Sequence, residues 1–274
     1  MSGPAETTGP ATPPSNLAGE GHRVVGFNTI VIREFSRIIR IWGQTIVPPV
    51  ITATLYFIIF GSLIGRRIGD MGGFTYMQYI APGLIMMAVI TNAYGNVVSS
   101  FFSAKMQRHL EEMLVAPMAT WTIVLGYTLG GVLRGLGVAA TVTAVALVFT
   151  RLHVAHLLVT ASVIVLTAFV FSLGGLINAI LADNFDDVSI IPSFVLTPLS
   201  YLGGVFYSIA LLPEFAQRLS LFNPILYMVN AFRYGMLGVA DVGLVTAYAV
   251  MLGIAGVLFA TCMVLIGRGT GIRS

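Results

Sequence analysis

Six long apolar segments occupy most of the 274-residue sequence and leave little chain for anything else. They cover residues 46–64, 74–102, 121–149, 157–181, 188–212 and 242–266. An α-helix needs about 20 apolar residues to cross the ~30 Å hydrocarbon core of a bilayer. Only 9% of the residues are charged, whereas soluble domains have about 25%. The sequence therefore predicts an all-α integral membrane protein with six transmembrane helices and excludes an ordinary soluble enzyme.

Two different stretches precede the first apolar segment. Residues 1–22 are rich in Pro, Gly, Ser, Thr and Ala, and they have almost no large apolar side chains. Such a composition cannot bury enough surface to offset the entropy of ordering, so we expect a disordered cytoplasmic tail. The transmembrane domain is then expected over residues 23–274.

Residues 26–42 have the pattern of an amphipathic helix. Apolar side chains recur at three- and four-residue steps, while Arg33, Arg37 and Arg40 share the opposite face. A helix of this kind lies in the membrane interface and directs its basic side chains to anionic headgroups. The alternative is that these residues are only the polar start of the first transmembrane helix.

Prolines mark irregular places along the chain. Pro48-Pro49 stand near the start of the first span, where a missing N–H costs least. Pro82-Gly83 and the polar residues after them are expected to break the second span. Residues 213–238 are too polar and punctuated for one helix, and Asn223-Pro224 predicts two short helices there. Because this stretch is also rich in aromatic residues, we expect a re-entrant helical hairpin between spans five and six.

The distribution of basic residues predicts the orientation of the chain. Eight Lys and Arg residues lie on the side that would hold both termini, and five lie on the other side. Because basic loops stay in the cytoplasm, both termini are expected to be cytoplasmic. The same scattering of arginines at segment ends makes nucleic acid an unexpected partner, although the net charge is +3.

Several kinds of chemistry find no support in the sequence. It contains no phosphate-binding GxxxxGK[ST] loop, no HExxH zinc pair and no GxSxG nucleophile motif. No Asp or Glu falls in the middle of a predicted span, which disfavours coupling to protons. The sequence therefore predicts neither a catalytic site nor a metal site in this chain.

Arg134 is the one ionisable residue that lies deep in a predicted span. An arginine at this depth is costly unless it faces a water-filled cavity, a polar seam or a partner. A structural role, in which it only ties helices together through backbone carbonyls, is the alternative. Four glycines in the same span, Gly126, Gly130, Gly131 and Gly135, form two small-xxx-small pairs that are typical of helix packing.

The loop after the second span, residues 105–117, combines charge with helical spacing. Charged residues gather at its start, Leu110, Met113 and Leu114 recur at helical steps, and Pro117 ends it. A short helix of this type could insert into a groove of a partner protein. A plain surface connector is the alternative.

Three segments together resemble a known family. They are Glu-Glu-Met-Leu-Val-Ala-Pro at residues 111–117, the run Leu-Thr-Pro-Leu-Ser-Tyr-Leu-Gly-Gly-Val-Phe-Tyr at 196–207, and the Leu-Pro, Asn-Pro-Ile-Leu-Tyr-Met and Phe-Arg-Tyr-Gly motifs within 212–235. In this order they resemble the ABC-2 type transporter permeases, closely those of the YadH type and more loosely the nodulation lipo-oligosaccharide exporters. One departure is Arg108-His109, where members often have Gly-Thr.

The resemblance implies a permease subunit that exports a lipid-like, glycolipid, polysaccharide or drug substrate from a bacterial inner membrane. It implies a homodimer, and two copies of a separate ATPase that binds ATP and Mg²⁺, so this chain itself would bind no cofactor. A secondary transporter or channel that needs no nucleotide is the alternative. Residues expected to couple to the ATPase are Arg33, Arg37, Lys105, Arg108, His109, Glu111, Glu112 and Leu114. Residues expected to line the pathway or the dimer seam are Arg134, Asn92, Tyr201, Phe206, Asn223 and Tyr227.

Overall fold

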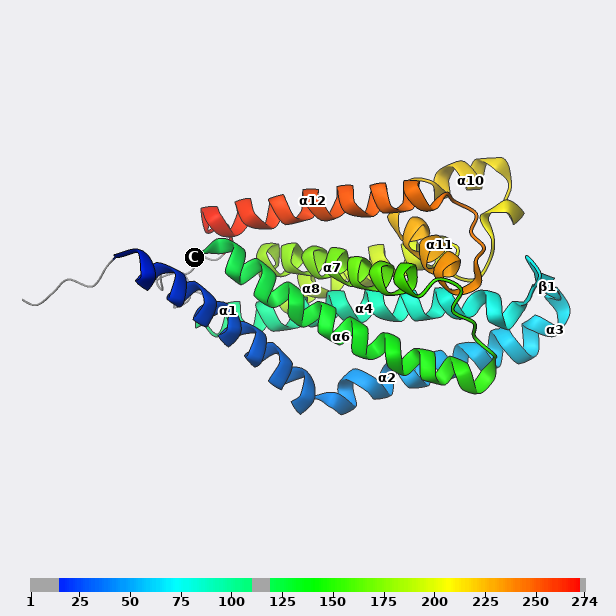
Figure 1. Ribbon diagram of the computed structural model, residues 1–274, viewed down its shortest axis with the longest axis horizontal. Helices are drawn as coiled ribbons and strands as arrows, with labels where there is room; N and C mark the ends of the chain where they lie inside the picture. Colours follow the sequence, from blue (N-terminus) through cyan, green and yellow to red (C-terminus); the bar gives the residue numbers. More distant parts are fainter. Residues whose placement is uncertain (1–14, 110–118, 272–274) are drawn as a thin grey trace, which may run out of the picture.

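The computed structural model describes residues 15–109 and 119–271, which form an elongated bundle of helices (Figure 1). Five of its helices are long and apolar enough to cross a membrane. They confirm five of the six expected spans: Trp42–Gly61, α4 (Tyr76–Met106), α6 (Thr120–Phe149), α7 (Leu157–Leu181) and α12 (Leu244–Arg268).

The segment expected as the fifth span is shorter than predicted. It consists of α8 (Phe185–Ile191), the π-helical turn η2 (Pro192–Leu196) and α9 (Thr197–Leu202). It ends at Gly203-Gly204, where Gly204 has a φ of 73°, and only a 3₁₀ turn, η3 (Ile209–Leu211), follows. The expected end at residue 212 is therefore wrong, because the left-handed turn stops the helix first.

The directions of α7 and α12 determine the path of the segment Phe185–Leu202 through the bundle. The hydroxyl groups of Ser162 and Tyr248, near the starts of the two helices, are hydrogen-bonded. At their other ends Gly271 packs against the carbonyl oxygen of Ile180. Since α7 and α12 run in the same direction, the chain between them must return along the bundle, and Phe185–Leu202 provides that return.

The N-terminal helix α1 (Ser15–Arg40) starts earlier than expected and turns at Ile41 into α2 (Trp42–Tyr56). Residues 15–22 are thus helical where we expected disorder, and residues 1–14 lie outside the described ones. Because α2 starts at Trp42, Pro48 and Pro49 lie inside the helix, not at its start as predicted. The helix continues as the π-helical η1 (Phe57–Ile64) and α3 (Gly65–Ile68).

A small hairpin and an uninterrupted helix follow α3. Strands β1 (Asp70–Met71) and β2 (Phe74–Thr75) pair in antiparallel fashion. Helix α4 then runs through Pro82 without a break, so the predicted interruption is wrong. Pro82 and Gly83 are buried, and Gly83 packs against the backbone of Val205. Neighbouring helices hold a proline-containing membrane helix together in this way.

The stretch between α9 and α12 confirms the two predicted short helices, α10 (Glu214–Ser220) and α11 (Pro224–Leu237). Asn223 separates them: its side chain accepts a hydrogen bond from the Ile225 amide and donates one to the Leu199 carbonyl over 2.7 Å. The fully buried Arg233 lies over the Tyr79 ring and donates to the Gly204 carbonyl over 2.6 Å. These contacts fix α11 against α4 and α9.

The two ends of the bundle differ. Helix α1 and the C-terminal end of α12 lie at one end, and the β-hairpin, α10 and α11 lie at the other (Figure 1). All-α architecture is confirmed apart from the four residues of the hairpin. We call the first of these the α1 end and the second the hairpin end.

Candidate functional site: a cationic cavity beside α1

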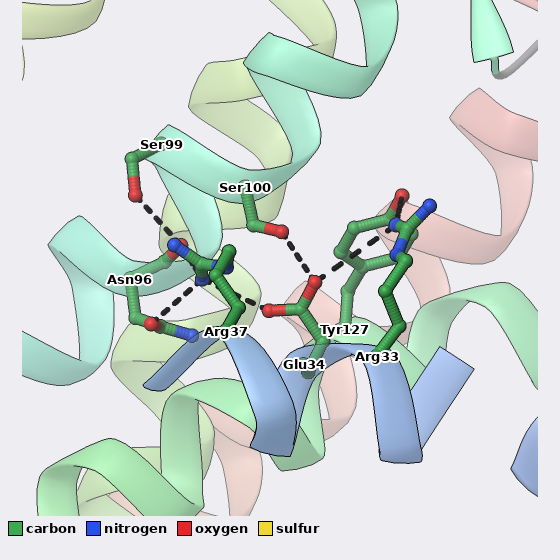
Figure 2. A network of polar contacts seen from close by, with 7 residues as sticks. All are labelled: Arg33, Glu34, Arg37, Asn96, Ser99, Ser100 and Tyr127. Carbon is green, nitrogen blue, oxygen red and sulfur yellow. Dashed lines mark hydrogen bonds and ion pairs between the residues drawn. The ribbon is translucent and has the colours of Figure 1, made fainter. Parts of the chain in front are cut away.

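A buried carboxylate fastens α1 to the bundle (Figure 2). Glu34 is only 1% exposed, and its Oε2 lies 2.9 Å from Arg37 Nη2. Its Oε1 accepts a hydrogen bond from the Ser100 hydroxyl of α4 and lies 3.9 Å from Arg33 Nη2. A charge this deeply buried is stable only when it is paired and hydrogen-bonded.

The two arginines beside Glu34 extend the network to two other helices. Arg37 Nη2 donates to Asn96 Oδ1 over 2.8 Å and to the Asn96 carbonyl over 3.1 Å. Arg33 donates to the Tyr127 hydroxyl of α6, and its guanidinium lies 5.4 Å from the centre of that ring. Figure 2 shows α1, α4 and α6 joined through these side chains.

This arrangement corrects the predicted orientation of the basic face of α1. We expected Arg33, Arg37 and Arg40 to point together at lipid headgroups. Arg40 is exposed, but the Arg37 side chain is only 25% exposed and points into the bundle. The physical reason is the carboxylate of Glu34, which attracts the neighbouring guanidinium groups into the protein.

Two glycines of α6 make the close approach of α1 possible. A Cβ atom at Gly130 would lie 2.9 Å from Cβ and Cγ of Glu34, and one at Gly126 would lie 2.7 Å from Ile30 Cγ2. Gly131 packs instead against the Ala93 carbonyl of α4. The small-xxx-small pattern therefore marks helix packing, as predicted.

A cavity of about 870 Å³ lies beside the network. Among the described residues, four arginines and one glutamate line it and together carry a net charge of +3, and most of the other lining residues are small or polar. The lining residues are Arg33, Glu34, Arg37, Arg40, Ile41, Gln44, Thr91, Asn92, Gly95, Ser99, Ser100, Ser103, Ala104, Gln107, His109 and Arg134. We call it the cationic cavity.

A second cavity of about 430 Å³ adjoins the first, and the two share Gln44, Thr91, Asn92 and Arg134. Its other walls are largely apolar, and Arg134 is the one charged residue in the described part of its lining. The lining residues not shared with the first are Pro48, Pro49, Thr52, Ala53, Tyr56, Leu84, Met87, Ala88 and Thr197. We call it the apolar cavity.

Aromatic side chains gather where the apolar cavity ends. Tyr56 lines this cavity, and its hydroxyl is 2.7 Å from the Tyr201 hydroxyl. The Phe206 ring stacks on Phe60 with centroids 4.6 Å apart, and on Tyr201 at 5.7 Å. Tyr201 and Phe206 thus lie at one end of the cavities that Arg134 and Asn92 line.

The structure places the other two expected pathway residues away from the cavities. Asn223 caps α11, and the Tyr227 hydroxyl donates to the Leu221 carbonyl over 2.8 Å. Both side chains stabilise the connection between α10 and α11. These local roles could be recognised only once the partners of the two side chains were known.

The residues expected to contact an ATPase occupy different environments. His109 lines the cationic cavity, whereas Lys105 donates to the carbonyl oxygens of Ile180 and Ala182 at the end of α7, over 3.0 and 2.7 Å. The Lys105 amine is therefore engaged inside the chain. Glu111, Glu112 and Leu114 lie outside the described residues.

Arg108 is the one described non-glycine residue with a positive φ, 60°. This left-handed conformation costs an L-residue about 1–2 kcal/mol and costs glycine almost nothing. The strain accounts for the glycine expected at this position from the family resemblance.

Changing Arg108 to glycine should therefore raise the thermal unfolding temperature, or leave it unchanged, while Arg108→Val should lower it. The adjacent Gln107 has a φ of −84°, so Gln107→Gly provides the control and should lower stability, because glycine loses more backbone entropy on folding. Thermal unfolding in a mild detergent measures all three. Equal losses in Arg108→Gly and Gln107→Gly would contradict the interpretation.

Four residues of the network were not predicted as site residues from the sequence: Glu34, Asn96, Ser100 and Tyr127. Their spacing held a partial signal, because Asn96 and Ser100 are four residues apart and so share a face of α4. Which helix would meet that face could not be inferred. Among the described residues no group of three or more His, Cys, Asp or Glu could hold a metal ion.

Comparisons with known proteins agree with this architecture. Residues 25–237 match the family model of the ABC-2 type transporter. The chain is 58% identical to the inner membrane transport permease YadH of Escherichia coli strain K12, over 91% of this chain and 98% of that protein. It is 26% identical to nodulation protein J of Rhizobium leguminosarum bv. viciae, over 67% of this chain and 71% of that protein. The chain therefore belongs to the ABC-2 type transporter family, as a transmembrane permease subunit and not an ATPase.

Proposed function

We propose that this chain is the membrane-spanning subunit of an ATP-driven exporter in a bacterial inner membrane. It would pair with a second copy of itself and with two copies of a separate ATPase, which bind the ATP and Mg²⁺. Family membership supports the role of permease, and the 58% identical relative is named an inner membrane permease. The substrate would be a lipid-like, glycolipid, polysaccharide or drug molecule that leaves the cytoplasm or the inner leaflet.

Six membrane crossings fit the path of the chain better than five. The segment Phe185–Leu202 returns along the bundle between two parallel helices, as described above. Its 18 residues rise about 27 Å at 1.5 Å per residue, close to the ~30 Å hydrocarbon core. With six crossings α1 and the end of α12 lie on the same side, which the basic residues mark as cytoplasmic.

The network around Glu34 is the observation that carries the proposal. It ties α1 to α4 through Arg37 and Asn96, and to α6 through Arg33 and Tyr127. Both α4 and α6 line the two cavities. A force applied to α1 by an ATPase would therefore reach the cavity walls through short, buried contacts, as coupling requires.

A second copy of the chain would complete the cavities. Polar Gln44 and Thr91 line both cavities and are exposed, and apolar Ile51 and Leu55 of α2 are about half exposed. Polar groups at membrane depth need a water-filled space or a protein partner. A homodimer that brings two such faces together would enclose a path toward the aromatic cluster of Tyr201 and Phe206.

Charge reversal in the loop after α4 tests the coupling. The double variant Glu111→Lys/Glu112→Lys should reduce co-purification of the partner ABC ATPase, and should reduce ATP hydrolysis stimulated by substrate. Glu214→Lys is the control, because Glu214 is 91% exposed at the hairpin end. Unchanged association in the double variant would overturn the assignment. Transport by the purified chain without any ATPase would favour the nucleotide-independent alternative.

A further inference from the structure

Among the residues that the structure describes, Arg134 has no partner that explains its position. It lies near the middle of α6, and no hydrogen bond or ion pair joins it to another described residue. Its Nε is buried without a hydrogen-bond acceptor, and so is that of Arg37, which lines the same cavity. A guanidinium without a partner is costly where it is shielded from water, so the space beside Arg134, which the unbonded Nε of Arg37 also adjoins, calls for an anion.

The position of Arg134 between two unlike cavities gives the shape of that anion. On one side lies the cationic cavity, with three further arginines. On the other side lies the apolar cavity, bounded by side chains such as Pro49, Met87 and Tyr56. A molecule that fills both spaces carries a negative group at one end and an apolar chain at the other.

We propose that the cargo is an anionic amphiphile whose phosphate or carboxylate group binds at Arg134, with Arg37 and Arg40 beside it, and whose apolar chain lies along α2. This deepens the proposed function, on which it rests, by naming the class of substrate and the residue that selects its charge. Glu34 determines where the positive charge of the site is concentrated. Its carboxylate neutralises part of the charge on Arg37 and Arg33, whereas the charge on Arg134 is not compensated by it.

Binding of a fluorescent phosphatidic acid to the purified chain in a neutral detergent tests the site directly. Because a hydrogen bond to a charged group contributes about 1.5–3 kcal/mol, Arg134→Gln should raise the Kd about tenfold or more. Arg134→Lys keeps the charge and should retain most of the affinity. Arg218→Gln is the matched control, since the Arg218 side chain is 82% exposed at the hairpin end.

Competition distinguishes the two parts of the ligand. Phosphatidylcholine with the same chains should displace the probe poorly, because its headgroup has no net negative charge. Inorganic phosphate should also compete poorly, because it lacks the chain. Thr52→Trp places a bulky side chain in the apolar cavity. It should weaken binding of the probe and leave the preference for phosphatidic acid over phosphatidylcholine unchanged.

Three outcomes of the binding measurements would overturn the inference. The first is equal affinity of wild type and Arg134→Gln for the probe, when thermal unfolding shows that both proteins are folded. The second is equal binding of phosphatidic acid and phosphatidylcholine. The third is displacement of the probe by inorganic phosphate at the same concentration as by phosphatidic acid. Stimulation of ATP hydrolysis by phosphatidic acid in the complex, lost in Arg134→Gln, identifies the bound amphiphile as cargo. Binding without stimulation in an intact complex would show a lipid site that is not for cargo and would contradict the proposal.

Failure of the proposed function would look different. If no ATPase associates with the chain, the exporter proposal fails, while binding at Arg134 is still measured on the chain alone. If the complex forms and hydrolyses ATP but Arg134→Gln behaves as wild type in binding, the exporter proposal stands and the assignment of the anion site falls.

Discussion

Replacing Glu34 with alanine should lower the free energy of unfolding by about 3 kcal/mol. The change leaves Arg37 and Arg33 without their shared carboxylate and leaves the Ser100 hydroxyl without its acceptor. Removing one partner of a buried ion pair typically costs 3–5 kcal/mol, and the partial exposure of Arg37 places this case at the lower end. Because the network ties α1 to α4 and α6, α1 should also separate from the bundle.

Denaturant unfolding in detergent micelles measures the loss, and limited proteolysis shows whether α1 is released. Glu214→Ala is the control: that residue is 91% exposed and lies 4.0 Å from Arg218, so its removal should cost less than 1 kcal/mol. The double variant Glu34→Leu/Arg37→Met should recover much of the loss, since apolar replacement of a buried pair is often neutral. Equal effects of Glu34→Ala and Glu214→Ala would contradict the role of the network.

Gly175→Ala should destabilise the contact between α4 and α7 by about 1–3 kcal/mol. A Cβ atom at Gly175 would lie 2.6 Å from the Tyr94 carbonyl oxygen and 3.2 Å from Val98 Cγ2. The backbone of Tyr94 cannot move away as a flexible side chain would, so α4 and α7 must separate to accommodate the new methyl group. Extra atoms in a packed interior cost about this much.

The neighbouring glycine supplies the control. At Gly174 the nearest atom to a new Cβ is 3.8 Å away, at the Tyr94 ring. Gly174→Ala should therefore be neutral or stabilising by up to about 1 kcal/mol, because alanine favours a helix more than glycine does. Opposite signs for the two variants in the same unfolding assay support the packing argument. Matching signs would show that helix propensity, not contact with Tyr94, controls both positions.

The elements that the sequence predicts correctly share a physical reason. Helices α6 and α7 begin and end within a residue of the prediction, because the length and hydropathy of a span follow from the thickness of the bilayer. The break at Asn223 was also predictable, since proline restricts the residue before it whatever the surroundings. The glycine pairs of α6 likewise indicated close packing.

The elements that the sequence predicts wrongly also share a physical reason. Pro82 was expected to break α4, yet buried contacts such as that of Gly83 with Val205 hold the helix together. The predicted fifth span extends to residue 212, because apolar residues continue past Gly204. In the structure the backbone turns at Gly204. In both cases a tertiary contact or a backbone conformation overrode the local hydrophobic pattern.

The candidate site was only partly visible in the sequence. Arg134 attracts attention by itself, because a charge deep in an apolar segment is rare. Lys105 has the same charge, yet it binds the end of α7 within the chain. Charge and spacing mark residues that need a partner, but they do not identify the partner.

The sequence by itself determined that this chain resides in a membrane, where most of its helices lie and which family it resembles, because segment length and hydropathy are local properties. Only the tertiary structure decided that Glu34 is buried, that Arg37 points inward, and that Arg134 stands unpaired between a cationic and an apolar cavity. The environment of a charge is set by the neighbouring helices that pack against it. Helical periodicity specifies the face on which a side chain lies, but not the surface that meets that face.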